Sequence, residues 1–279
     1  MLLSLLKSLY FQLLTFYNKD RLNKVKIPVN IQEDCLILGN GPSLLIDIDT
    51  IKLDPNPKAV VNNFGFNELY EIIKPKFYYI VDPAYWAENI TSEYLEDRKL
   101  FRILHEKTNW ELMIIVPFVA YKKISQEFGN HKFIKVHFYN HTIIPWNYKD
   151  NLVAKMYSRF MGSPRLQNVI GASIFISIVL GYKNIKLFGV EHSWLADIVV
   201  DEENRVCWKE KHFYEVASVR PHLKSNGENY KLHELLFDYG HMFNSYHIIK
   251  KFADISKCQI INCTSNSYID AFYKLKKND

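Results

Sequence analysis

The ten residues from Cys35 to Leu44, Cys-Leu-Ile-Leu-Gly-Asn-Gly-Pro-Ser-Leu, constrain the fold of this chain most strongly. The apolar start of the segment, with a β-branched residue among its aliphatic side chains, predicts a buried strand. The two glycines that follow allow a sharp turn and a close approach to a ligand. Pro and Ser then suit a helix start, where free backbone N–H groups favour phosphate or another anion. The candidate ligand contacts of this turn are Gly39, Asn40, Gly41, Pro42 and Ser43.

This turn differs from two well-known phosphate-binding motifs. Leu44 stands where the third glycine of the dinucleotide fingerprint would be, and no Gly-Lys-Ser/Thr follows as in a P-loop. A tight strand-to-helix turn that binds nothing is therefore the alternative interpretation, and both stay open.

Composition restricts the class of protein. A chain of 279 residues is long enough for one large α/β domain or two small ones. The net charge of +5 permits an anionic ligand or a membrane surface, and gives no argument for nucleic acid. The aromatic content of 15% suits either a sugar or base pocket or a core filled with tyrosine and phenylalanine.

Cysteine spacing argues against a zinc site or a disulfide framework. The cysteines show neither a Cys-x-x-Cys pair nor histidine spacing typical of zinc. We expect buried thiols in a reducing cytoplasm. The four cysteines are Cys35, Cys207, Cys258 and Cys263.

The N-terminal segment, residues 1–30, is expected to form an amphipathic helix and a basic linker. Leucines and aromatic residues recur at helical spacing over residues 1–18, a run shorter than a bilayer span and without a secretory cleavage site. Basic residues follow within residues 19–26. Residues 1–26 therefore suit peripheral contact with the inner face of the cell membrane, or packing on the domain or on a partner subunit.

Apolar segments alternate with helical ones along residues 31–279. The predicted strands are 35–39, 58–66, 76–83, 113–118, 132–139, 184–190 and 258–263. The predicted helices are 91–108, 171–181 and 230–252, with a helix or loop at 44–53. This order predicts one Rossmann-like α/β domain, with a mostly parallel sheet and helices on both faces. The polar, irregular stretch at about 195–228 suits a small lid.

Polar residues follow the predicted strands. In a parallel sheet ligands bind beyond the carboxyl ends of the strands, so these residues are expected to gather there. They are hydrogen-bonding and poor in lysine, which suits a nucleotide or a sugar. The residues at these ends are Asn40, Asn63, Asp82, Glu191, His192 and the run 264–266.

The reaction class follows from what these residues can do. No Gly-x-Ser-x-Gly elbow is present, and the one Asp-x-Asp pair, Asp47 and Asp49, falls in the predicted helix and is interpreted as solvated surface. A metal-independent transferase needs a base for the acceptor hydroxyl, and histidine serves because its pKa lies near neutral. The candidates are His233, His241 and His192. His233 lies near a helix start, whose dipole disfavours the imidazolium.

Three islands of sequence resemble the bacterial sialyltransferases of glycosyltransferase family 42. They are the turn at 39–44, Asn63, and the stretch from Gly171 to Glu191. The resemblance implies a CMP-sialic-acid donor, a Rossmann-like domain with a lid, inversion at the anomeric carbon, and no metal or other cofactor. It also implies that the turn and Asn63 bind the donor, and that His233, or next His241, is the catalytic base.

The chain departs from that family at several donor contacts. Asp82 falls near a second donor-binding asparagine of the family, and the family's Arg-x-Thr-Ser-Gly stretch is here residues 167–171. The tyrosine that the family has after the strand at 184–190 falls here at Ser193 or Trp194. A different nonulosonic acid would fit these changes. The remaining donor contacts considered are Asn168, Gly171, Tyr214 and Tyr230.

Other functions stay open. The same glycine turn occurs in a wider group that resembles 6-hydroxymethylpterin diphosphokinase and flagellin-modifying transferases, which would imply a magnesium-dependent pyrophosphokinase-like enzyme. A non-catalytic nucleotide-binding partner in glycan assembly is a further alternative. For the transferase, the expected acceptor is a cell-surface or lipid-linked glycan, the location is cytoplasmic and membrane-peripheral, and self-association is left open.

Overall fold

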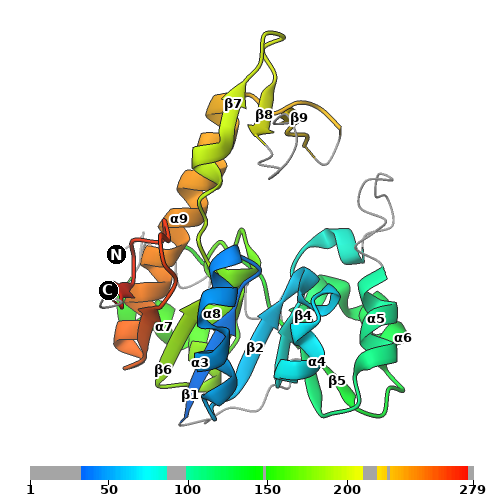
Figure 1. Cartoon of the computed structure of the whole chain (residues 1–279). Helices are drawn as coiled ribbons and strands as arrows, with labels where there is room; N and C mark the ends of the chain where they lie inside the picture. The colour runs from blue at the N-terminus through cyan, green and yellow to red at the C-terminus, as the bar shows by residue number, and fades with distance from the viewer. Residues whose placement is uncertain (1–32, 87–98, 147–148, 210–218, 225–226, 276–279) are drawn as a thin grey trace.

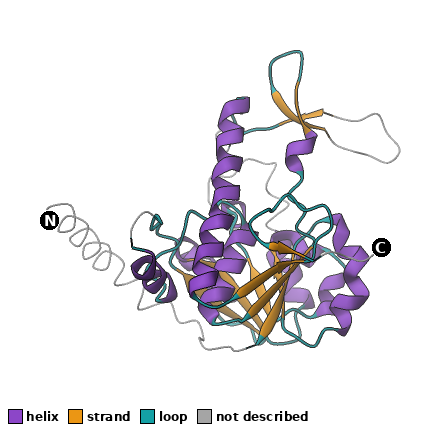
Figure 2. Ribbon diagram, turned by 90° about the vertical axis from the view of Figure 1, so that its left-hand side faces the viewer, coloured by secondary structure: helices purple, strands orange, loops and turns teal. Residues whose placement is uncertain are grey.

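The computed structural model describes residues 33–86, 99–146, 149–209, 219–224 and 227–275. Its centre is an eight-stranded sheet in the order β11-β10-β6-β1-β2-β3-β4-β5 (Figures 1 and 2). Every pairing in this sheet is parallel. The predicted α/β class with a mostly parallel sheet is confirmed, and the arrangement is consistent with a Rossmann-like fold.

The strands of the main sheet are short, and all of them except β11 contain buried residues. They are β1 (Asp34–Leu38), β2 (Lys58–Val61), β3 (Phe77–Tyr79), β4 (Leu112–Pro117), β5 (Ile134–Tyr139), β6 (Asn184–Phe188), β10 (Gln259–Asn262) and β11 (Tyr273–Lys274).

Helices and 3-10 turns connect these strands. They are η1 (Pro42–Asp47), α3 (Ile48–Leu53), η2 (Asn62–Phe66), α4 (Leu69–Ile73), η3 (Pro83–Tyr85), α5 (Lys99–Lys107), η5 (Phe118–Ala120), α6 (Tyr121–Phe128), α7 (Asp150–Ser158), α8 (Val169–Leu180), η6 (Trp194–Asp197) and α9 (Leu232–Ile255).

The direction of winding reverses once, between β1 and β6. From β1 the chain moves outward through β2, β3, β4 and β5, and it then returns to place β6 on the other side of β1. Such a reversal leaves a crevice beyond the carboxyl ends of the two strands on either side of it, where ligands of open α/β sheets bind. The topology thus points to the loops after β1 and β6.

Two hydrophobic cores cover the two faces of the sheet, because successive strand side chains alternate in direction. Cys35 and Ile37 of β1 pack with residues of α7, α8 and α9, whereas Leu36 and Leu38 pack with residues of α4, α5 and α6. Most of the largest fully buried side chains are tyrosines, so much of the aromatic surplus fills the core. The four cysteines are buried, and none of them forms a disulfide with another described residue.

Helix α8 is the central core helix, and its ends explain its limits. Every one of its residues except Val169 is buried. The Asn168 side chain accepts a hydrogen bond from the Gly171 N–H at 2.8 Å and so caps the first turn. Gly181 ends the helix at φ 98°, as the sequence predicts.

Each predicted strand is present, but the one predicted at 58–66 ends at Val61, and residues 62–66 form η2 instead. Several other elements were not foreseen. Helices α4, α6 and α7 and strand β11 have no counterpart in the predictions, and of the predicted helix at 91–108 only α5 lies within the described residues. The predicted long helix corresponds to α9, and residues 44–53 form the end of η1 followed by α3.

The region predicted to be irregular contains a second sheet. Strands β7 (Ile198–Val200), β8 (Val206–Lys209) and β9 (Val219–Pro221) pair antiparallel. This small sheet and the first turns of α9 project well beyond the main sheet (Figures 1 and 2), and we call them the arm. Strands of three or four residues within a polar stretch carry too little apolar alternation to be predicted.

The proposed membrane segment, residues 1–26, lies outside the described residues. Among the helices that the structure describes, none combines the length and the apolar character needed to cross a bilayer.

Two glycines on helices provide a test of the backbone geometry. Ala at Gly181, where φ is 98°, should lower the free energy of unfolding by about 1–2 kcal/mol, because a Cβ is strained there. Ala at Gly240, in the middle of α9, should raise it by up to about 1 kcal/mol, because an added Cβ meets no atom within 4 Å. Urea unfolding measures both, and changes of the same sign would contradict this geometry.

Candidate functional site

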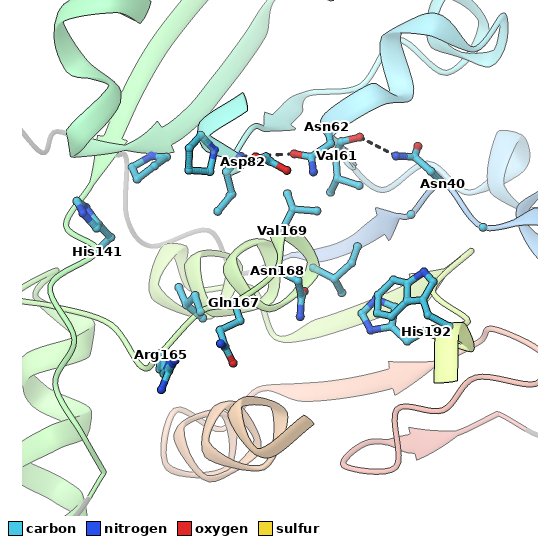
Figure 3. Close-up of a pocket in the computed structure, with 18 of the residues that line it drawn as sticks. Asn40, Val61, Asn62, Asp82, His141, Arg165, Gln167, Asn168, Val169 and His192 are labelled. Atoms are coloured by element: carbon cyan, nitrogen blue, oxygen red, sulfur yellow. Dashed lines mark hydrogen bonds between the residues drawn. The ribbon is translucent and has the colours of Figure 1, made fainter. Parts of the chain in front are cut away.

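A cleft at the carboxyl edge of the main sheet has a volume of about 1190 Å³. Its walls are the ends of β1, β2, β3 and β6, the loops after β4 and β5, and the start of α8. Figure 3 shows Asn40 and Asn62 along one side, Arg165 and Asn168 along the opposite side, and His192 at one end. The cleft therefore spans the point where the winding reverses.

The glycines after β1 allow the loop after β1 to contact the loop after β6. The Gly39 N–H donates to the Phe188 carbonyl at 2.8 Å, and the Gly41 N–H donates to the Gly189 carbonyl at 2.9 Å. A Cβ at Gly39 would lie 2.2 Å from the Gly189 oxygen. The loops after β1 and β6 are thus pressed together in a way that only glycine permits.

A carboxylate of the chain occupies the predicted anion position. The Ser43 N–H donates to Glu191 Oε1 at 2.7 Å, and a Cβ at Gly41 would lie only 1.6 Å from Glu191 Oε2. The expectation of free N–H groups at this turn is therefore wrong for Ser43. Oε2 is buried and has no hydrogen-bond partner among the described residues, so it is an unused acceptor in the wall of the cleft.

Asn62, rather than Asn63, faces the cleft from the end of β2. Asn62 has φ 42°, a left-handed conformation that Asn tolerates. The Tyr78 hydroxyl fixes it there by donating to the Asn62 carbonyl while accepting the Gly65 N–H. Asn63 lies outside the cleft lining, and its side-chain oxygen accepts a hydrogen bond from Tyr85 at 2.7 Å.

The side of the cleft formed by residues 163–170 carries its positive charge. Arg165 is the one Lys or Arg among the described lining residues, and no salt bridge joins it to another described residue. Asn168 Nδ2 is buried and has no hydrogen-bond partner among the described residues, and α8 begins at the next residue. A cation, an unused N–H donor and the positive end of a helix dipole together favour an anionic group.

His192 lies at the end of the cleft next to the β6 loop. It is buried, with 6% of its surface exposed, and its φ of 52° is left-handed. Its ring lies 4.4 Å from the Trp194 ring centroid, and its Nδ1 lies 3.2 Å from the Tyr246 hydroxyl. Burial lowers the pKa of His192 from its usual value near 6.5 to about 3, so the ring is neutral at pH 7.

The structure brings together many but not all of the predicted contacts. Those that line the cleft are Gly39, Asn40, Gly41, Pro42, Asp82, Asn168, Glu191, His192 and Ser193. Those outside its lining are Ser43, Asn63, Gly171, Tyr230, His233 and His241, whereas Tyr214 lies outside the described residues.

The two histidines proposed as base lie on α9 with exposed side chains. His233 is the second residue of the helix, as predicted, and belongs to the arm, while His241 lies further along. Tyr230 lies two residues before α9: its ring stacks on His222, and its hydroxyl donates to Asp238 at 3.2 Å. In this structure none of the three lines the cleft.

Several lining residues were not foreseen, and sequence signals for them are weak. Asn62 differs from the predicted Asn63 by one position, which only the backbone conformation decides. Arg165 and Gln167 lie in the coil before α8, where no local pattern marks a contact. Trp194 follows the predicted Glu191–Ser193 run directly.

The Asp-x-Asp pair lies away from the cleft. Asp49 is exposed on α3, as interpreted, but Asp47 is buried at the end of η1, so the description as solvated surface is wrong for Asp47. Within the described ranges, no three His, Cys, Asp or Glu side chains gather in a way that would hold a metal ion.

Neither a protein-family model nor a curated protein matches this chain.

The buried neutral histidine predicts a pH dependence of stability. The folded state keeps the pKa of His192 low, so below about pH 6.5 the unfolded state binds a proton that the folded state does not. The free energy of unfolding therefore decreases as the pH is lowered. Because of this residue, the free energy of unfolding should be about 2 kcal/mol lower at pH 5 than at pH 7.5.

Urea unfolding of His192→Gln at both pH values tests this. The loss of stability on acidification should be smaller than in the wild type by about 2 kcal/mol. His233→Gln, at an exposed position on the first turn of α9, is the matched control and should keep the wild-type dependence. Equal dependence in the wild type and His192→Gln would contradict the buried neutral ring.

Proposed function

We propose that this protein is a glycosyltransferase that moves a sialic-acid-like (nonulosonic) sugar from a CMP donor to a glycan, with inversion and without a metal. The observation that carries the proposal is the cleft at the winding reversal, lined by amide, carboxylate and imidazole groups and by a single cation among its described residues. The sequence resemblance described above supports the choice of donor.

The volume of the cleft suits two substrates. Small-molecule sites usually measure roughly 300–1,000 Å³, so a cleft of about 1190 Å³ has room for a nucleotide sugar and the reacting end of an acceptor. A transferase must hold both at once, because proximity and orientation supply much of its rate enhancement.

The charge of the lining favours a donor with a single phosphate. A CMP-sugar carries one phosphodiester, and a nonulosonic sugar adds one carboxylate. One arginine, the unused Asn168 N–H and the start of α8 are a modest set of partners for such charges. A nucleoside diphosphate or triphosphate brings more charge and is usually matched by several cations.

The unused groups also suggest an orientation for the donor. Glu191 Oε2 needs a hydroxyl or amino donor and repels phosphate, so the nucleoside or sugar hydroxyls belong near the β1 and β6 loops. The anionic groups belong on the opposite side, near Arg165 and Asn168. Asn40, which donates to the Val61 carbonyl at 3.2 Å, lies on the hydroxyl side.

The rest of the proposal concerns elements away from the cleft. The arm is the part of the chain that we expect to act as a lid, and His233 or His241 would reach the substrates only if α9 and the arm moved. Peripheral membrane contact through residues 1–26, a lipid-linked or cell-surface glycan acceptor and a cytoplasmic location complete the proposal.

Calorimetric binding of CMP, CDP, UDP, GDP and ATP, each with Mg²⁺ and with EDTA, tests the donor class. We expect CMP to bind in both conditions and Asn40→Ala to weaken it about tenfold, which is the effect of losing about 1.4 kcal/mol. Asn130→Ala, at an exposed position after α6 outside the cleft lining, is the matched control and should bind as the wild type does.

Other results would favour the alternatives. Binding of ATP alone, and only with Mg²⁺, would replace the proposal with a pyrophosphokinase-like enzyme. CMP binding without turnover of any CMP-nonulosonic acid, in the presence of glycan acceptors, would favour a non-catalytic nucleotide-binding partner.

A further inference from the structure

A hydrogen-bonded chain links His192 to the first turn of α8. Tyr246 of α9 is completely buried, and its hydroxyl lies 3.2 Å from His192 Nδ1 and 3.0 Å from Asn168 Oδ1. Asn168 Oδ1 in turn accepts the Gly171 N–H at 2.8 Å. The chain thus connects a wall of the cleft to two core helices.

The helix cap decides which way the amide of Asn168 points. Because the Gly171 N–H can only donate, the atom of Asn168 that faces it must be the oxygen, and a flipped amide would place two donors against each other. The same oxygen faces Tyr246, so the Tyr246 hydroxyl donates its one proton to Asn168. Burial raises the pKa of Tyr246, which keeps that proton in place.

The tautomer of His192 follows. The Tyr246 oxygen has already donated its proton, so it can only accept from His192, and Nδ1 of the ring must carry the hydrogen. In a neutral imidazole Nε2 is then a bare acceptor. No hydrogen bond from any described residue reaches Nε2, and His192 lines the cleft.

We propose that Tyr246, oriented by Asn168, is a positioning residue that holds His192 as the Nδ1–H tautomer, so that Nε2 accepts the hydroxyl proton of the acceptor in the transfer proposed above. This inference rests on the proposed function. The O–H bond of the acceptor breaks and its proton passes to Nε2, while the oxygen forms the new bond to the anomeric carbon. The bond from that carbon to the phosphate oxygen breaks, its electron pair stays on the leaving CMP, and solvent later removes the proton from His192.

The surroundings of the ring are compatible with this role. The Trp194 ring lies close to the His192 ring in a tilted arrangement and Tyr246 binds Nδ1, while the neighbouring carboxylate, Glu191, accepts the Ser43 N–H. A ring with so low a pKa is a weak base, but an anionic donor beside it would raise that pKa toward its usual value. Proton acceptance is then coupled to occupation of the cleft by the donor.

Long-range ¹H–¹⁵N NMR of the full chain with ¹⁵N-labelled histidine identifies which ring nitrogen of His192 carries the hydrogen. We expect Nδ1–H in the wild type and a shift of the population toward Nε2–H in Tyr246→Phe, which removes only the acceptor hydroxyl. Tyr182→Phe is the matched control, because the Tyr182 hydroxyl is buried without a partner among the described residues and lies beyond the other end of α8. It should leave the His192 signals unchanged.

Kinetics then test the proton transfer. With a CMP-nonulosonic acid and a glycan acceptor, Tyr246→Phe should lower kcat by 10- to 100-fold with the KM for the donor within twofold. His192→Gln should lower kcat at least as far.

An Nε2–H wild type, or an unchanged tautomer in Tyr246→Phe, would overturn the positioning role. Normal kcat in His192→Gln would overturn the proton transfer. A wild type that turns over no CMP-sugar would overturn the proposed function and this step with it, whereas the tautomer result is measured without any substrate and stands apart from that failure.

Discussion

The contact between the loops that follow β1 and β6 is the constraint on which the rest of the site depends. Gly39 and Gly189 allow the two backbones to meet, and the Glu191 carboxylate binds the Ser43 N–H across them. Because this contact lies where the winding of the sheet reverses, it forms part of the wall of the cleft. It also gives that wall a negative charge and an unused acceptor, which is the opposite of a phosphate-binding glycine loop.

Helix α8 connects the core to the other side of the cleft. The helix is buried almost throughout, so the position of its first turn is fixed by packing rather than by the surface. Asn168 caps that turn and accepts the hydrogen bond of the Tyr246 hydroxyl, and its Nδ2 is buried without a hydrogen-bond partner among the described residues. Through these hydrogen bonds a single amide connects the buried helix both to His192 and to the proposed anion position, so that both are held in place as a preorganised site requires.

Much of the fold was predictable because its signals are local. Apolar runs such as residues 184–190 predict buried strands, and Gly181 marks the end of α8. The site was predicted less well because its decisive contacts join distant residues: the bond from Ser43 to Glu191 spans 148 positions. The choice of Asn62 over Asn63 depends on one backbone angle, and His233 was favoured for a helix start that proved to lie on the projecting arm.

The most direct test of this account is a crystal structure of the full chain with CMP in the presence of EDTA. We expect the ribose hydroxyls or the cytosine amino group within hydrogen-bond distance of Glu191 Oε2, and the phosphate on the opposite side of the cleft near Arg165 and Asn168. A phosphate bound to the backbone of residues 39–43 with Glu191 displaced, or CMP bound outside the cleft, would contradict it.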